Sequence, residues 1–73
     1  MNLNEFVDCF AAEFDETPKE IFGPKTIYKD LDEWDSLAVL SIISMIDEEF
    51  EKSVTGADLR EYTTISDLYN FLQ

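Results

Sequence analysis

Apolar side chains recur at helical spacing in three segments of this chain, and that spacing limits its fold more than any other feature. The segments are residues 3–14, 36–51 and 65–72. In each, apolar residues repeat every three or four positions and so form one stripe along a helix. Residues 57–61, after Gly56, are typical of a short helix, the third of four along the chain, and no segment is convincing as a strand. We predict an all-α fold, a small four-helix bundle of three longer helices and one short one.

The 36–51 helix is expected to turn one face to the core and the other to solvent. At about 100° per residue, the core face carries Val39, Ile42, Ile43, Ile46 and Phe50, with Leu40 at its edge. The opposite face carries Leu37, Ser41, Ser44 and Glu48, flanked by Asp47, Glu51 and Met45. Leu37 is therefore expected to be an exposed apolar residue.

Two helix starts carry a recognisable pattern. Asn2 with Glu5 resembles a capping box, and Thr64 with Asp67 is a variant of the same motif. In such a box each side chain accepts a hydrogen bond from the other residue's backbone N–H. Helices are thus predicted to begin directly after Asn2 and Thr64.

A long connection separates the first two helices. It begins near Pro18, which a helix interior tolerates poorly, and runs to Asp35. A structureless connection of this length is uncommon in a small domain unless it is packed or functional. Its scattered apolar residues predict that it is pinned across the bundle; they are Ile21, Phe22, Ile27, Tyr28 and Leu31.

Composition narrows the possible partners. The 73 residues are enough for one domain, 1–73, and their net charge is -12 with no histidine. Such a surface repels nucleic acid and favours cationic protein surfaces, with salt-sensitive association. The single Cys9 cannot form an internal disulfide, and no Cys/His cluster suggests zinc. No signal peptide or membrane span is evident, so a cytoplasmic monomer without membrane insertion is expected.

Three further segments indicate a family. Asp35-Ser36-Leu37 lies near mid-chain at the start of the second helix, after an acidic stretch. That helix ends on Ile46-Asp47-Glu48-Glu49-Phe50, and the last one opens on Thr63-Thr64-Ile65-Ser66-Asp67-Leu68. In these motifs, and in the segment from Thr26 to Leu31, the chain resembles acyl carrier proteins. The resemblance runs without a gap from about Thr26 to Leu72.

The resemblance implies a carrier, not an enzyme. Ser36 would receive 4′-phosphopantetheine from coenzyme A through a separate phosphopantetheinyl transferase, since no histidine or lysine abuts it to activate the hydroxyl. The arm ends in a thiol that carries acyl groups as thioesters between the enzymes of fatty-acid or related specialised biosynthesis. Asp35 is expected to cap the helix by accepting from the N–H of Leu37 or Ala38, and also to contact the transferase.

The resemblance also implies two sets of contact residues. Partner recognition falls to Asp35, Leu37, Asp47 and Glu48, which would meet basic patches on acyltransferases, ketosynthases and related enzymes. An interior acyl cavity would be lined by Leu40, Ile46, Leu59, Tyr62 and Leu68. Many fatty-acid carriers have carboxylates where this chain has Ala38 and Ser41, which leaves a specialised pathway open beside fatty-acid synthesis. They also often have smaller residues at 59 and 68, so poor shelter for long acyl chains is expected.

Trp34 lies directly before Asp35, at the entry to the second helix. Trp34 with Val39 fits a hydrophobic staple in front of this helix, rather than a direct substrate contact.

Other functions remain as alternatives to an acyl carrier. A peptidyl or D-alanyl carrier shares the fold and serine, and an unmodified docking adaptor would act only by binding partners. A calcium-binding module is suggested by Asp30, Asp32 and Asp35, but the EF-hand spacing fails because its fifth position is Trp34.

Overall fold

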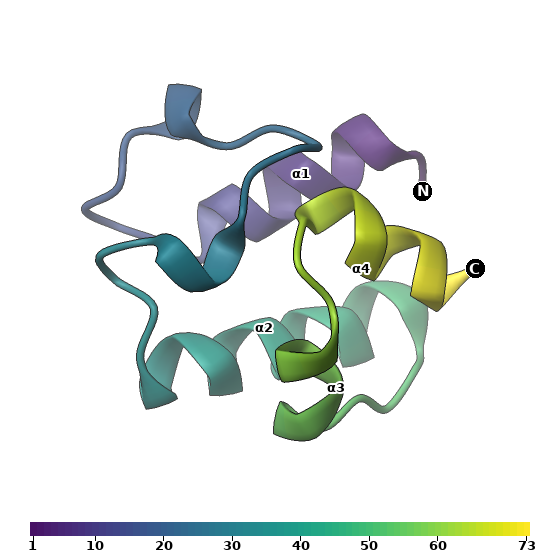
Figure 1. The fold of residues 1–73 in the computed structure, drawn as a ribbon. Coiled ribbons are helices and arrows are strands. Elements are labelled where there is room, and N and C mark those ends of the chain that lie inside the picture. Colours follow the sequence, from purple (N-terminus) through teal and green to yellow (C-terminus); the bar gives the residue numbers. More distant parts are fainter.

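The computed structural model describes residues 1–73 and is helical, with no strands. Its four helices are α1 (Leu3–Ala12), α2 (Ser36–Phe50), α3 (Gly56–Glu61) and α4 (Ile65–Leu72). Two 3₁₀ turns, η1 (Lys19–Ile21) and η2 (Tyr28–Asp30), interrupt the connection between α1 and α2 (Figure 1). The predicted all-α fold is confirmed. None of the helices combines the length and the apolar character needed to cross a bilayer.

Local capping explains where three of the helices begin. The backbone N–H of Glu5 donates to Asn2 Oδ1 at 2.8 Å, and that of Asp67 donates to Thr64 Oγ1 at 3.0 Å, so both predicted capping boxes are confirmed. A third box, between Thr55 and Asp58, was not predicted and starts α3 one residue early, at Gly56.

The helices enclose a core of 16 buried residues, all of them hydrophobic. α1 packs against α2 and α4, while the short α3 packs against α2. Figure 1 shows α2 as the longest helix, with α3 beside its middle and both chain ends on the same side of the molecule. Aromatic rings fill the α1 side of the core, where Phe10 lies 5.6 Å from Tyr28 and 5.7 Å from Phe14 between ring centres.

The buried face of α2 differs from the predicted one. Ile42 and Ile46 are fully buried as expected, but Ala38 and Met45 are buried too. Val39, Ile43 and Phe50 are only partly buried against the core. The helix is therefore rotated toward the α1 side relative to the prediction, and Ala38 lines one groove with Glu13 and Phe14, which follow α1.

The connection between α1 and α2 is pinned across the bundle, as predicted. Phe22 and Tyr28 are buried in the core. The Tyr28 hydroxyl donates to the carbonyls of Leu59 and Tyr62, the latter at 3.0 Å. The N–H of Ile65, at the start of α4, donates to the carbonyl of Thr26 at 3.1 Å. The connection therefore links α3 and α4 to the rest of the fold.

Candidate functional site

Ser36 is the first residue of α2 and its side chain is exposed. Asp35 precedes it in extended conformation and caps the helix, because its Oδ1 accepts from the N–H of Ala38 at 2.9 Å. The Asp35 carbonyl accepts from the N–H of Val39 at 3.0 Å. The structure thus agrees with the capping role expected for Asp35 and selects Ala38 as its partner.

This capping leaves two donors at the helix start. The first N–H groups of a helix have no partner within it, and Asp35 satisfies that of Ala38. The N–H groups of Ser36 and Leu37 remain directed outward, at the positive end of the α2 dipole. An anion attached to the Ser36 oxygen would lie at this end, where it is electrostatically favoured.

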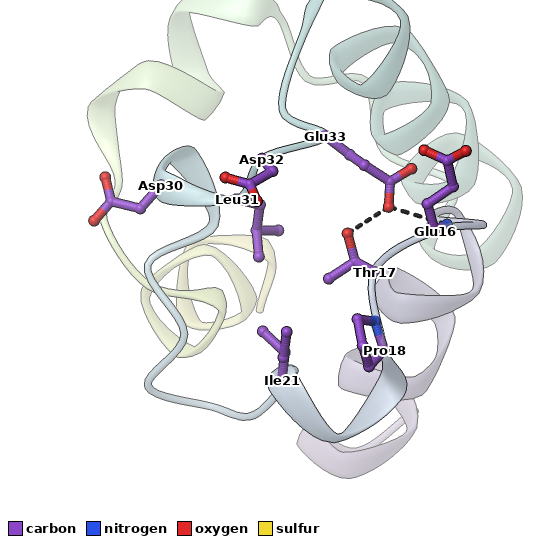
Figure 2. Close-up of a pocket in the computed structure, with 8 residues that line it drawn as sticks. All are labelled: Glu16, Thr17, Pro18, Ile21, Asp30, Leu31, Asp32 and Glu33. Carbon is purple, nitrogen blue, oxygen red and sulfur yellow. Dashed lines mark hydrogen bonds between the residues drawn. The ribbon is translucent and has the colours of Figure 1, made fainter.

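The segment leading to Ser36 is fixed by side-chain contacts. The Glu33 carboxylate accepts from the Thr17 hydroxyl and, at 3.1 Å, from the N–H of Glu16 (Figure 2). The Trp34 ring lies 5.0 Å from Tyr28 and stacks on Phe10 at 6.4 Å, between ring centres. Trp34 therefore anchors the approach to α2 on the aromatic cluster, a role the sequence did not predict. Its staple with Val39 stays a prediction.

The residues expected to meet partners lie on the outward side of α2. Leu37 is 73% exposed, and Asp47 and Glu48 are exposed near the other end of the helix. Leu40, which was expected in the acyl cavity, is instead 60% exposed. The rotation of α2 toward α1 carries Leu40 away from the core and onto the outward face.

The other residues expected to line an acyl cavity lie inside the fold. Ile46, Leu59 and Leu68 are at most 1% exposed and belong to the hydrophobic core. Tyr62 is partly buried and stacks on Phe71, with ring centres 4.7 Å apart. Four of the five predicted lining residues are thus buried or partly buried, and their role in an acyl cavity stays a prediction.

Comparison with known families decides what kind of site this is. The sequence model of the phosphopantetheine attachment site family matches residues 4–72, nearly the whole chain. The chain belongs to this family. The match confirms the resemblance to acyl carrier proteins, and the family attaches a 4′-phosphopantetheine group. Searches of curated proteins and of solved structures return no significant match.

The residues present fit the phosphopantetheine of this family. Its attachment needs an accessible hydroxyl and tolerance for a phosphodiester anion beside it. The exposed Ser36 provides the first, and the outward N–H groups of the first turn of α2 provide the second. The carboxylate of the preceding residue, Asp35, accepts from the N–H of Ala38. The capped start of α2 therefore leaves Ser36 exposed to solvent.

Proposed function

We propose that this protein is an acyl carrier whose 4′-phosphopantetheine is attached to Ser36. When bound, the group supplies a flexible arm ending in a thiol, on which acyl groups are held as thioesters. The observation that carries the proposal is the exposed Ser36 at the capped start of α2, in a chain that belongs to the phosphopantetheine attachment site family. The role proposed for the chain is to hold and present the arm, while separate enzymes do the chemistry.

The proposed partners are enzymes with basic docking patches. A phosphopantetheinyl transferase would load Ser36 from coenzyme A, and acyltransferases, ketosynthases or related enzymes would use the loaded arm. Four exposed residues lie on α2 or at its N-cap: Asp35, Leu37, Asp47 and Glu48. They are the residues proposed to meet these partners, with the carrier acting as a monomer in the cytoplasm.

The pathway proposed is a specialised one rather than general fatty-acid synthesis. Positions 38 and 41 on the flank of α2 carry alanine and serine, so the middle of α2 offers no carboxylate to a basic patch. The carboxylates of α2 begin only at Asp47. Enzymes that bind a carrier through carboxylates along the whole of its second helix would lack part of their contacts here, so different partners are proposed.

The proposal is tested by treating the apo protein with coenzyme A and a broad-specificity transferase. Intact-mass analysis should show the gain of one phosphopantetheine in the wild type and none in Ser36→Ala. Modification that persists in Ser36→Ala, or that maps to Ser41 or Ser44, contradicts the assignment. The absence of any mass gain in the folded wild type favours an unmodified adaptor instead.

A further inference from the structure

Arg60 is the only arginine of the chain, and its guanidinium has no anionic partner. Carboxylates are abundant, with 17 acidic residues against 5 basic ones, yet the only ion pair of the protein joins Lys19 and Asp8 at 3.6 Å. Arg60 takes part in one side-chain hydrogen bond, through its carbonyl, which accepts from Lys29 Nζ at 2.6 Å. The guanidinium itself is therefore free to bind an anion.

The place of this guanidinium is given by Gly56, the first residue of α3. A Cβ at Gly56 would lie 3.6 Å from Arg60 Nη1 and 3.9 Å from Val39 Cγ1. The Arg60 side chain therefore folds back along α3 and meets the Val39 side chain over the start of that helix. Figure 1 shows α3 alongside α2. Because Val39 is the fourth residue of α2, the guanidinium lies beside the N-terminal half of α2.

This position is close to the proposed attachment residue. Val39 follows Ser36 by three residues on α2. Residues at this spacing are neighbours on a helix surface, with ~5–6 Å between their Cβ atoms. The Arg60 guanidinium thus lies about one helical turn from the Ser36 side chain, on the α3 side. Since Arg60 is exposed, its long side chain can turn toward an anion attached to Ser36.

The carboxylates near Arg60 are held away from it. That of Asp58 accepts a backbone N–H at 2.9 Å in the capping box of α3, and that of Asp35 accepts one at 2.9 Å at the start of α2. Glu61 is adjacent in the sequence, but such neighbours do not face each other on a helix. α2 itself has no acidic residue before Asp47. The capping of both helices therefore leaves the single arginine unpaired.

Lys29 fixes the backbone that carries Arg60. Its bond to the Arg60 carbonyl links η2 to the last turn of α3, and Lys29 is partly buried. It also brings a second positive charge to the end of α3. The backbone at Arg60 is thus held in place, while its side chain keeps its freedom to move.

We propose that Arg60 binds the phosphodiester of a phosphopantetheine attached to Ser36 and so holds the root of the arm against α3. The inference rests on the proposed carrier function and assigns a positioning residue for the arm. A guanidinium offers paired N–H donors that match the spacing of phosphate oxygens. An exposed ion pair is weak by itself, but the covalent link to Ser36 keeps this anion within reach of Arg60 at all times.

Reach favours the phosphodiester over an anion at the other end of the arm. A carboxylate on a carried acyl group would lie beyond the thiol, a full arm length from Ser36. The phosphodiester lies directly on the Ser36 oxygen, about one helical turn from the guanidinium. The nearer anion is therefore the ligand that this geometry fits.

The contact is tested by NMR on the wild-type protein before and after loading with coenzyme A and a broad-specificity transferase. The guanidinium resonances belong to Arg60 without ambiguity, because the chain has no other arginine. Their protons should shift downfield in the holo form, where they donate to an anionic oxygen. Added salt should return them toward their apo positions, since an exposed ion pair is screened. Unchanged guanidinium resonances on loading overturn the inference.

The ³¹P resonance of the holo phosphodiester gives a second measurement. Arg60→Gln should move it away from its wild-type position, and Arg60→Lys should restore part of the difference, because an ammonium keeps the charge but not the paired donors. Lys52→Gln is the matched control, since it removes the same charge from an exposed residue beyond the other end of α2. Its ³¹P resonance should equal that of the wild type. Equal ³¹P positions in the wild type and Arg60→Gln contradict the contact.

Loading the arm with an acetyl or a malonyl group separates the two anions that Arg60 could meet. Guanidinium resonances that move only with the malonyl group identify its carboxylate as the ligand and overturn the phosphodiester contact. A mass gain at Ser36 without any response of Arg60 keeps the carrier function and overturns this inference, whereas no mass gain in the wild type overturns both. Melting temperatures of Arg60→Gln and Lys52→Gln should stay close to that of the wild type, because both positions are exposed.

Discussion

Asp35 lies at the point where the fold and the proposed site meet. Its side chain satisfies the N–H of Ala38, and its neighbour Ser36 is left exposed at the first helical position. A cap fixes the direction of the first turn of α2 and with it the direction of the Ser36 side chain. Asp35 thus contributes to the stability of α2 and Ser36 is the proposed attachment residue, so the two roles can be tested by separate substitutions.

Asp35→Ala should lower the free energy of unfolding by about 1 kcal/mol, because the N–H of Ala38 loses its side-chain acceptor. Ser36→Ala is the matched control and should change it by less than about 0.5 kcal/mol, since the cap remains. Urea unfolding followed by circular dichroism measures both. A larger loss in Ser36→Ala than in Asp35→Ala contradicts the assignment of the cap.

The raised pKa of the Tyr28 hydroxyl leads to a predicted loss of folding stability at high pH. Burial, with the nearby charge of Asp67, raises the pKa of Tyr28 to about 12 from its usual 10. The folded state therefore keeps the proton more tightly than the unfolded chain. The stability that this provides is complete below pH 10 and is lost as the pH rises from 10 toward 12, by up to about 2 kcal/mol.

Tyr28→Phe is the control for this pH dependence. It should be less stable at pH 7 by about 1 kcal/mol, because the carbonyls of Leu59 and Tyr62 lose a donor. It should also lose less stability than the wild type between pH 9 and 11 in urea unfolding. Parallel curves for the two proteins over this range contradict the assignment to Tyr28.

Among the elements, α2 shows most clearly what sequence can predict and what it cannot. Its start at Ser36 follows from the Asp-Ser-Leu motif and its cap, and its end at Phe50 is one residue from the prediction. Its rotation could not be predicted, because apolar residues surround its first three turns. Met45 is buried and Leu40 is exposed, and this outcome depends on tertiary packing that the apolar pattern of the helix does not specify.

The same limit applies to the site as a whole. Ser36 and Leu37 are identified by a short motif in its sequence context. The acidic groove beside Leu37 and Ala38 could not be found in this way, because its carboxylates come from the C-cap of α1, the connection and the α2 cap. The capping box of Thr55 and Asp58 is different: its signal was present in the sequence, at the spacing already recognised for Thr64 and Asp67.

The end of α2 carries a strain that a substitution can relieve. Glu51 follows the helix with φ 55° and ψ 37°, the left-handed conformation that glycine adopts most easily. Glu51→Gly should raise the free energy of unfolding by about 1 kcal/mol. Glu49→Gly, on an exposed position inside the same helix, should lower it by about 1 kcal/mol. Chemical unfolding that gives both variants the same sign contradicts this account.

At the scale of the whole molecule, dense packing limits what the interior can accept. Tyr28 ties the connection to α3, the Thr26 carbonyl ties it to the start of α4, and Leu59 and Leu68 are buried in the core. Interiors at native density resist insertion, with overpacking costs of about 1–3 kcal/mol. An acyl chain on the proposed arm would therefore remain largely outside, or enter only at the cost of rearrangement.

Chain length provides the corresponding test. Loading C4 and C8 acyl groups onto the holo protein should shift the amide resonances near Ser36 in both cases. Those of residues 40–68 in the interior should move little, because large buried side chains occupy the space there. Large interior shifts with the C8 chain alone would show that the core opens, which contradicts poor shelter for long chains.

The central claim, a phosphopantetheine carried on Ser36, is tested most directly on the protein purified from its own source. After hydroxylamine treatment to cleave thioesters, mass spectrometry of the peptide that contains Ser36 measures what the residue carries. The account predicts one phosphopantetheine, localised to Ser36 by fragmentation. Recovery of this peptide only in unmodified form, or with the group on Ser41 or Ser44, would contradict it.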